Sequence, residues 1–380
     1  MSMRLWCRER PFPSASASKS FRTTFVQPSI CTRWLTEYAT EKSKPCFRSM
    51  REDAINRGVV MAKVLVINQE LFAEMLSFRE AMETVELAFS QFAQGKSAVF
   101  PSVREKVGEH NGIYSIKSAY LSEESAIGLK TGGFWSDNWQ SGKTNHQSVM
   151  LLLCPQTGEP TCLLDANLLT AIRTAAAGAI AAKYLARQKS KSVALIGAGV
   201  QARAQLEGLL HLFPLETVSV YSRTDASAAR LTEEITRMGL GARQAASAQE
   251  AVEQADIVVT TTPAFSPVLK SSWLQAGTHV NAMGSDTSGK REIELDRLPD
   301  KLVCDWWEQA SHLGELQGQP SRDSLFAELG QITSKEKPGR QSASEITLFD
   351  STGIAVQDLS VAAFVYRKAK ETGKGMYVDL

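Results

Sequence analysis

The pattern of apolar and polar positions divides the chain into two kinds of segment. Between residues 64 and 94 a short apolar strand, VLVI, precedes apolar residues at helical spacing, which extend from Phe72 to Phe92. Between residues 101 and 164 come short β-type runs, GIYSIKSAY, AIGLKTGGFW and SVMLLLC, separated by turn-forming residues. We expect a sheet here, followed by a long alanine-rich helix over residues 169–187, because alanine is the best helix former.

From residue 192 onward, strands alternate with helices. The strands are VALIG, TVSVYS, IVVTTT, THVNAM and KLVCDW, with helices predicted up to Leu210 and over residues 226–238. Such alternation is typical of a parallel, doubly wound sheet. The chain then continues with a strand and turn, ITLFDSTGIAVQD, and a helix that begins near Asp358. The prediction is an α/β protein with a Rossmann domain over residues 181–344, inserted into an α+β domain formed by residues 61–180 and 345–380.

The first 60 residues have a different composition. They hold 11 Lys+Arg against 5 Asp+Glu, a serine-rich patch from Ser14 to Ser20 and little periodicity. This composition is typical of an organelle transit peptide. The alternative is an upstream extension or a misassigned start codon, with Met61 as the working start. We expect a cytoplasmic protein, with organelle import if residues 1–60 are a genuine transit peptide.

Overall charge and cysteine content favour a small-molecule partner. The formal net charge is +1, so there is no electrostatic reason to expect nucleic acid or an anionic membrane as partner. No apolar run reaches the roughly 20 residues needed to cross a bilayer. The six cysteines contain no CxxC pair and are interpreted as reduced thiols, and the five histidines lack the spacing of metal ligands.

The strongest local signal is a glycine turn between a strand and a helix. The run Val193 to Ala202, VALIGAGVQA, contains GxGxxA. In such a turn Gly197 permits the tight bend, Gly199 lets the backbone approach a pyrophosphate, and Ala202 lets the helix pack closely. The free N–H groups of the helix then face the phosphates. The cofactor-binding residues predicted in this turn are Gly197, Ala198, Gly199, Val200 and Gln201.

The end of the next strand favours NADP(H) over NAD(H). NAD enzymes usually place an acid there to bind the ribose hydroxyls. This chain has Ser222, Arg223 and Thr224 instead, and a guanidinium with two hydroxyls suits a 2′-phosphate. NAD(H) stays as the alternative. Thr261 and Thr262, at the end of IVVTTT, are expected at the carboxyl edge of the sheet, where ligands of doubly wound folds bind.

Three cations of the first domain are candidate substrate ligands, Arg104, Lys130 and Arg173, and two of them interrupt otherwise apolar stretches. A cation in such a place is costly unless paired, so either an acidic side chain or a ligand carboxylate must satisfy it. Lys117 is a fourth candidate. Asp286, in GSDTSGK after THVNAM, is a candidate proton donor or acceptor, although an Asp beside glycines is also a common turn former.

Together these segments resemble the ornithine cyclodeaminase and mu-crystallin family from about Met61 to the end of the chain. The matching runs are the Pro-x-x-Arg at Arg104, GLK at Lys130, LLDANLLTAIRTAAA, ALIGAGVQARAQ, GSDTSGKREIEL and TLFDSTGIAVQD. The resemblance implies a homodimer formed through the sheet of the substrate domain. It also implies that Arg104, Lys130 and Arg173 hold the substrate carboxylate, and that Asp286 handles protons at the substrate nitrogen, with Lys130 and Asp286 as the catalytic pair.

Departures from the family pattern favour one branch. The run GIYSIKSAY lacks the acid that holds the side-chain amine in ornithine cyclodeaminase, and the acid that binds NAD is replaced by Ser222-Arg223. The runs IKSAY and GLKTGGFW resemble the Δ1-pyrroline-2-carboxylate reductase branch, which implies NAD(P)H-dependent reduction of a cyclic ketimine to proline or pipecolate. The alternatives are ornithine cyclodeaminase, alanine dehydrogenase, and a non-catalytic NADP-dependent binding protein similar to mu-crystallin.

Overall fold

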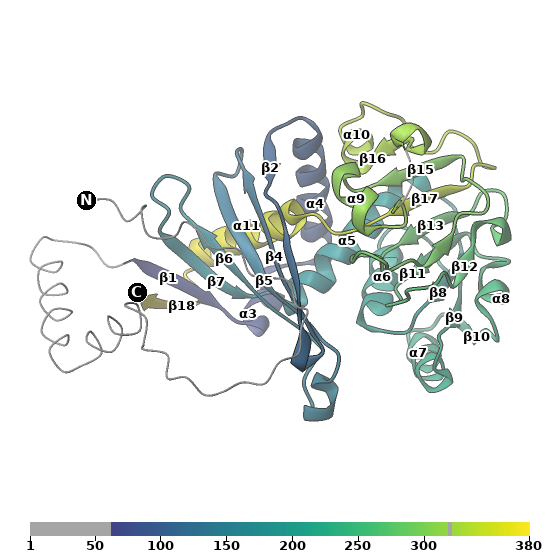
Figure 1. Cartoon of the computed structure of the whole chain (residues 1–380), viewed down its shortest axis with the longest axis horizontal. Helices are drawn as coiled ribbons and strands as arrows, with labels where there is room; N and C mark the ends of the chain where they lie inside the picture. Colours follow the sequence, from purple (N-terminus) through teal and green to yellow (C-terminus); the bar gives the residue numbers. More distant parts are fainter. Residues whose placement is uncertain (1–61, 318–320) are drawn as a thin grey trace, which may run out of the picture. The chain divides into compact units, whose positions relative to one another are not determined.

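The computed structural model describes residues 62–317 and 321–380. The predicted extension at residues 1–60 lies outside this range. Two large sheets organise the described chain (Figure 1). The prediction of an α/β protein with a parallel Rossmann sheet and a second α+β region is confirmed.

The first sheet is mixed and has eight strands. Seven lie in the order β18 (Met376–Asp379), β1 (Lys63–Ile67), β7 (Pro160–Asp165), β6 (His146–Leu153), β5 (Ala126–Trp135), β4 (Gly112–Leu121) and β2 (Ser97–Val99), and β3 (Val103–Val107) pairs with β4. The pair β1 and β7 is parallel and the other pairs are antiparallel. Short 3-10 turns occur at Gly108–His110 and Asn138–Ser141.

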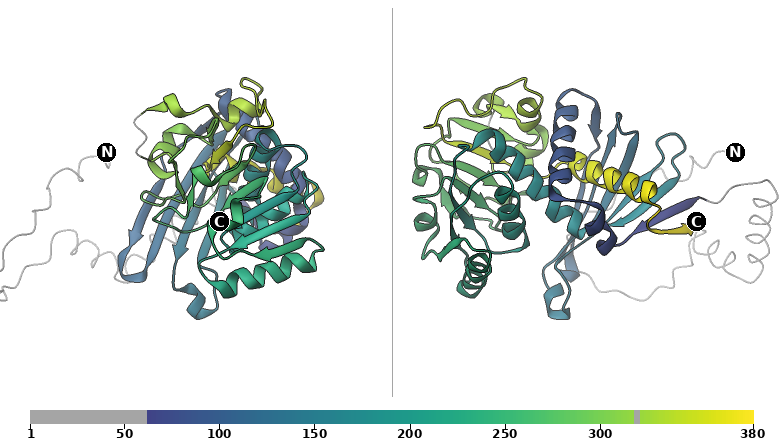
Figure 2. Two further views of the ribbon diagram at one scale, coloured as in Figure 1. Left: turned by 90° about the vertical axis from the view of Figure 1, so that its right-hand side faces the viewer. Right: turned by 180° about the vertical axis from the view of Figure 1, so that it is seen from behind.

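Helices cover one face of this sheet. They are α3 (Gln69–Met75), α4 (Phe78–Ala93), α5 (Asn167–Leu185) and α11 (Ala355–Thr372). The view from behind shows α11 lying across the strands (Figure 2). The expectation of one helix between residues 72 and 92 was wrong, because Ser77 accepts from the backbone N–H of Glu80 while the Glu80 carboxylate accepts from that of Ser77. This capping box starts a second helix.

The second sheet is entirely parallel. Its strands lie in the order β10 (Gly241–Gln244), β9 (Thr217–Tyr221), β8 (Ser192–Ile196), β11 (Ile257–Thr260), β13 (His279–Ala282), β17 (Thr347–Asp350), β15 (Lys301–Cys304) and β16 (Ala327–Glu328). The chain moves outward from β8 to β9 and β10, and then reverses to β11 on the other side. The gap between β8 and β11 is therefore the switch point, where doubly wound folds bind ligands.

The helices of this region are α6 (Val200–Leu210), α7 (Asp225–Arg237), α8 (Ala248–Val252), α9 (Trp307–Leu313) and α10 (Leu329–Thr333). A small pair, β12 (Leu269–Lys270) and β14 (Ile293–Glu294), and 3-10 turns at Ser271–Trp273 and Arg322–Ser324 complete it. The range 345–380, placed with the first domain by sequence, contains β17, which pairs within the parallel sheet, and α11, which packs on the first sheet.

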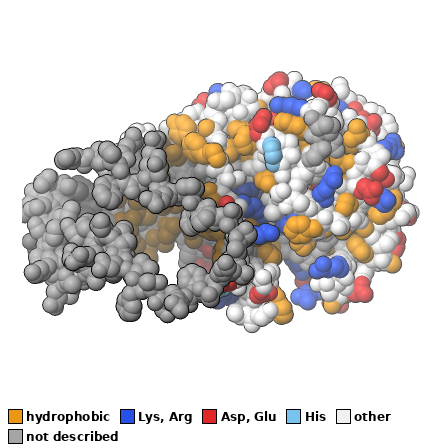
Figure 3. Space-filling model, in the orientation of Figure 1, with side chains coloured by type: hydrophobic (Ala, Val, Ile, Leu, Met, Phe, Trp, Pro, Cys, Tyr) orange, Lys and Arg blue, Asp and Glu red, His pale blue; other side chains and the backbone are white. Residues whose placement is uncertain are grey.

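Most predicted strands appear close to their expected positions, because their apolar side chains form the two cores. Leu65 and Met150 belong to one buried cluster, and Val258 and Val280 belong to another. The helix expected near Asp358 begins three residues earlier, at Ala355. None of the described helices is both long and apolar enough to cross a membrane. On the face shown in Figure 3, acidic and basic side chains are interspersed over the described surface.

Candidate active site

The glycine turn connects β8 to α6. Gly197 has φ +111°, in the region that favours glycine, and a Cβ there would lie 2.7 Å from Thr261 Oγ1. A Cβ at Gly199 would meet nothing within 4 Å, so the turn is open on the side where a ligand would approach. Arg203 fixes the turn by donating to the carbonyls of Ala198 and Gly199 at 2.9 and 3.1 Å. The local geometry is that of a phosphate-binding turn at a helix N-terminus.

Three buried polar atoms near this turn lack a hydrogen-bond partner among the described residues. They are Gln201 Oε1, Thr261 Oγ1 and Thr262 Oγ1. Buried polar groups are normally paired, so unpaired ones at the switch point fit a ligand that brings its own donors and acceptors. These residues fit a bound dinucleotide. Ser222, Arg223 and Thr224 follow β9, and Arg223 and Thr224 are exposed, within reach of solvent and of a ligand.

Strand register brings the cations of the first sheet onto one face. Arg104 on β3 lies opposite Ser115 on β4, and Lys117, two residues further along, lies opposite Lys130 on β5. Residues two apart on a strand share a face, and so do directly opposed residues on neighbouring strands. Arg104, Lys117 and Lys130 therefore point to the same side of the sheet, which α5 and α11 cover.

A buried acid from α11 neutralises part of this cation group. Asp358 is 1% exposed, and its Oδ1 lies 2.7 Å from Lys130 Nζ and 2.9 Å from Arg173 Nε. Burial alone would raise the pKa of Asp358, but Arg173 and Lys130 outweigh it and hold that pKa below its usual value. Burial lowers the pKa of Lys130 to about 7, with Asp358 opposing and Arg173 reinforcing the shift. Lys130 is therefore poised to change its charge near neutral pH.

Lys117 is held by main-chain carbonyls. Its Nζ donates to Gly353 O at 2.6 Å and to Thr352 O at 3.2 Å. Burial lowers its pKa, and the neighbouring Arg173 lowers it further. Gly353 has φ +74°, and a Cβ there would lie 2.7 Å from Arg173 Nη1. The turn between β17 and α11 therefore supports both Lys117 and Arg173.

Asp286 lies in the loop after β13 and completes the site. Its Oδ2 is 3.3 Å from Arg104 Nη2 and its Oδ1 is 2.8 Å from Lys290 Nζ. Burial opposes ionisation, but Lys290 and Arg104 outweigh it and hold the pKa of Asp286 well below its usual range. Asp286 is therefore a carboxylate at neutral pH. Arg104 Nε is buried without a partner among the described residues, so this guanidinium retains a free donor.

The contacts fall into two sets: Arg104 pairs with Asp286, while Lys130 and Arg173 pair with Asp358. Lys117 joins the second set through the Gly353 turn, which also contacts Arg173. Lys130 and Arg173 share an internal acid, which is the salt-bridge alternative left open by the sequence. Sequence reasoning missed the roles of Asp358 and Lys290. The signal for Asp358 was present, since a single acid interrupts the apolar run of α11, AVQDLSVAAFV.

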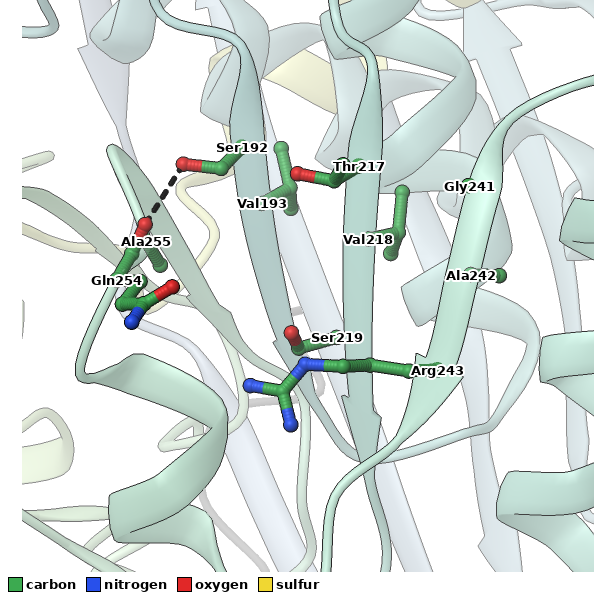
Figure 4. A pocket seen from close by; sticks show the side chains of 10 residues that line it. All are labelled: Ser192, Val193, Thr217, Val218, Ser219, Gly241, Ala242, Arg243, Gln254 and Ala255. Atoms are coloured by element: carbon green, nitrogen blue, oxygen red, sulfur yellow. Dashed lines mark hydrogen bonds between the residues drawn. The ribbon is translucent and has the colours of Figure 1, made fainter.

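Two cavities lie elsewhere. One is lined by the first residues of β8, β9 and β10, Ser192, Thr217 and Gly241, at the edge of the sheet opposite to Gly197 (Figure 4). Two of its polar side chains are paired, because Ser192 Oγ donates to Gln254 O at 2.9 Å (Figure 4) and Arg243 donates to Glu250. The other lies between the β2–β3 connection and α9, with Phe100, Trp306 and Gln309 in its wall.

In residues 62–317 and 321–380, no cluster of three or more His, Cys, Asp or Glu is arranged to hold a metal ion.

The parallel sheet, the glycine turn and the cation group define a dinucleotide-dependent oxidoreductase with a second, mixed-sheet region. The model of the ornithine cyclodeaminase/mu-crystallin family matches residues 61–373. The chain belongs to this family, and it is an NAD(P)-dependent oxidoreductase within it.

Characterised relatives act on different substrates. Alanine dehydrogenase of Archaeoglobus fulgidus is 37% identical over 82% of this chain and 97% of its own length. Iminosuccinate reductase of Paracoccus denitrificans is 34% identical over 83% of this chain and 100% of its own. The solved Δ1-pyrroline-2-carboxylate reductase of Thermococcus litoralis, in complex with NADH and L-proline, is 34% identical, covers 83% of this chain and 100% of its own, and has a TM-score of 0.79.

Proposed function

We propose that this protein reduces the C=N bond of a cyclic 2-imino acid, such as Δ1-pyrroline-2-carboxylate or Δ1-piperideine-2-carboxylate, to the cyclic amino acid. The observation that carries this proposal is the shared face of Arg104, Lys117 and Lys130, with Asp286 across from Arg104. Convergent cations clamp a carboxylate and so fix the carbon next to it. The relative of known structure that binds L-proline and NADH is consistent with this chemistry.

The proposed mechanism gives each side chain one task. Arg104, Lys130 and Arg173 bind the carboxylate and orient the imine carbon. NADPH, when bound, supplies the hydride to that carbon and is left as NADP⁺. The substrate nitrogen is protonated in the iminium form, and the Asp286 carboxylate accepts a hydrogen bond from that N–H. The nitrogen keeps this proton in the amine product. Lys130 has a pKa of about 7, so a bound carboxylate favours its charged form.

The cation group argues against ornithine cyclodeaminase activity. The side-chain ammonium of ornithine needs an acid, whereas the residue facing Lys130 on the neighbouring strand is Lys117. A lysine at that position would repel the ammonium of ornithine.

A second candidate substrate class is an imino acid with two carboxylates. It is favoured by an excess of cations over acids among the described residues, since Arg104, Lys117, Lys130, Arg173 and Lys290 lie near three acids, Asp286, Asp305 and Asp358.

We propose NADP(H) as the preferred cofactor, because the acid expected of an NAD enzyme is replaced by Ser222-Arg223-Thr224 after β9. Solved relatives bind NAD or NADH, so NAD(H) is the alternative.

We also propose a homodimer. The outward row Val103, Ile116, Thr131 and Val149 continues across four strands on the face opposite to the helices, with Val103 and Val149 about two-fifths exposed. A relative is described as a dimer.

The test is a panel assay on the purified chain with NADPH and NADH. The panel contains the two cyclic imino acids, iminosuccinate, pyruvate with ammonia, and ornithine. The proposal expects fastest turnover with a cyclic imino acid and NADPH. Asp286→Asn should lower kcat by roughly a hundredfold, the usual range for a group that bonds the reacting atoms, while NADPH affinity stays unchanged. Turnover of iminosuccinate alone would select the second candidate, and ammonia release from ornithine would overturn both.

A further inference from the structure

The loops that follow β11 and β13 meet at one point. Gly284, after β13, lies so close to the backbone of Thr262, after β11, that a Cβ at Gly284 would collide with the Thr262 carbonyl. Thr262 belongs to the candidate cofactor side of the site, and Asp286 lies two residues beyond Gly284. The spacing between these loops therefore sets the spacing between cofactor and Asp286.

One buried carboxyl bonds both loops. Glu292 is fully buried, and its Oε1 accepts from the backbone N–H of Thr262. Its Oε2 accepts from the backbone N–H of Gly284 and from Thr260 Oγ1, each at 2.7 Å. Glu292 forms no ion pair with any of the described residues. Both of its oxygens therefore accept hydrogen bonds from the end of β11 and from the two loops.

A second carboxyl supports the first. Glu315 is also fully buried, and its Oε1 accepts from the backbone N–H of Glu292 at 2.8 Å and from Ser285 Oγ. Its Oε2 accepts from the backbone N–H of Ile293 at 2.9 Å. Burial, with a smaller contribution from the neighbouring Glu315, raises the pKa of Glu292 to about 7. Neither carboxyl forms an ion pair among the described residues, and burying two such groups is costly, so an apolar pair would fill the space more cheaply.

We infer that Glu292 is a positioning residue, which fixes the distance between the cofactor loop at Thr262 and the Asp286 carboxylate. The inference rests on the proposed function only in assigning Asp286 to the substrate nitrogen. A misplacement of about 1 Å costs roughly a hundredfold in rate, so a single acceptor joining both loops has a direct kinetic consequence.

The test variant is Glu292→Gln. The amide keeps the shape of the side chain, but one oxygen becomes an NH₂ group, which cannot accept from either backbone N–H. The matched control is Glu294→Gln, two residues away on β14, where the carboxylate is half exposed and pairs with Lys270 at 3.2 Å. Thermal unfolding of both variants checks that each is folded.

We expect Glu292→Gln to lower kcat by roughly tenfold to a hundredfold, with a change in substrate KM of less than about threefold. Residues that act through one another are non-additive, so the loss should shrink when Glu292→Gln is made in the Asp286→Asn background. Glu294→Gln should match the wild type. A kcat within about twofold of wild type, or a loss that simply adds to that of Asp286→Asn, would overturn the inference.

A binding measurement separates this inference from the proposed function. NADPH and NADH are titrated by fluorescence against the wild type, Glu292→Gln and Glu294→Gln, with no imino acid present. Because either Thr262 N–H or Gly284 N–H loses its acceptor and the loop contact is weakened, Glu292→Gln alone should weaken binding, by roughly threefold to tenfold for the loss of one hydrogen bond. If the wild-type protein turned over no imino acid, the proposed function would be wrong. If the cofactor affinity of Glu292→Gln were unchanged, the inference about Glu292 would be wrong.

Discussion

Lys117 and Lys130 lie directly opposite each other on β4 and β5, and both are turned to the buried face of the sheet. Directly opposed like charges destabilise a sheet. Both lysines have lowered pKa values, for which burial is the largest cause. Asp358 neutralises only part of this positive charge. The remaining charge is available to bind an anion.

Asp358→Asn tests that compensation. The change leaves Lys130 and Arg173 buried without their shared carboxylate. Breaking a buried ion pair by removing one partner costs about 3 to 5 kcal/mol, so the free energy of unfolding should fall by that amount. Urea unfolding measures it, with Glu371→Gln, an exposed position on the same helix, as control. A loss below about 1 kcal/mol would show that Asp358 is not the main counter-charge.

The lowered pKa of Lys130 predicts how anion binding depends on pH. The lysine is charged below its pKa of about 7 and neutral above it, so the affinity for a carboxylate should decline as the pH rises through 7. The inhibition constant of 2-furoate, whose ring does not titrate, should rise by up to about tenfold per pH unit from about pH 7 upward. An inhibition constant that stays level between about pH 6 and about pH 9 would contradict the assignment of Lys130 to the carboxylate.

Gly353→Ala tests the support given to Arg173. The methyl group would press on Arg173 Nη1, and the positive φ adds backbone strain. Gly158→Ala is a matched control, because Gly158 has φ +76° and a Cβ there meets nothing within 4 Å. Strain alone costs on the order of 1 kcal/mol in both variants. Only Gly353→Ala should also raise the substrate KM, by roughly tenfold, and equal KM values for the two variants would separate Gly353 from the site.

Arg223→Ala tests the cofactor preference. If Arg223 binds a 2′-phosphate, its removal should raise the KM for NADPH by roughly tenfold to a hundredfold, as expected for a charged hydrogen bond. The KM for NADH should change little. Steady-state kinetics with both cofactors measures this, and Arg237→Ala at the end of α7 serves as control. Equal effects on NADPH and NADH would remove Arg223 from the 2′-phosphate site.

The sequence predicted local features well and distant contacts poorly. The glycine turn and the strands around it follow from short motifs, and two of the three candidate cations, Lys130 and Arg173, stand out because they interrupt apolar runs. Asp358 could be noticed as a single acid in an apolar run, but its partner could not be predicted, because the contact with Lys130 spans 228 positions along the chain. The same holds for Glu292, whose partners Thr260 and Thr262 are brought near only by the order of strands in the parallel sheet.

Register was the other feature that the sequence left open. The alternation of GIYSIKSAY and AIGLKTGGFW predicts two strands, but the pairing of Lys117 with Lys130 depends on the turn between Leu121 and Ala126. A shift of one residue would move one of these lysines to the opposite face. The split between α3 and α4 could have been predicted, since Ser77 and Glu80 have the spacing of a capping box.

The proposed chemistry requires the cations on one face of the mixed sheet to hold the substrate carboxylate. Arg104→Gln tests it most directly, with Lys63→Gln, an exposed position on β1, as control. We expect Arg104→Gln to lower kcat/KM for Δ1-pyrroline-2-carboxylate by roughly a hundredfold while the NADPH dissociation constant stays within about twofold of wild type. An unchanged kcat/KM in Arg104→Gln would show that these cations do not hold the substrate carboxylate.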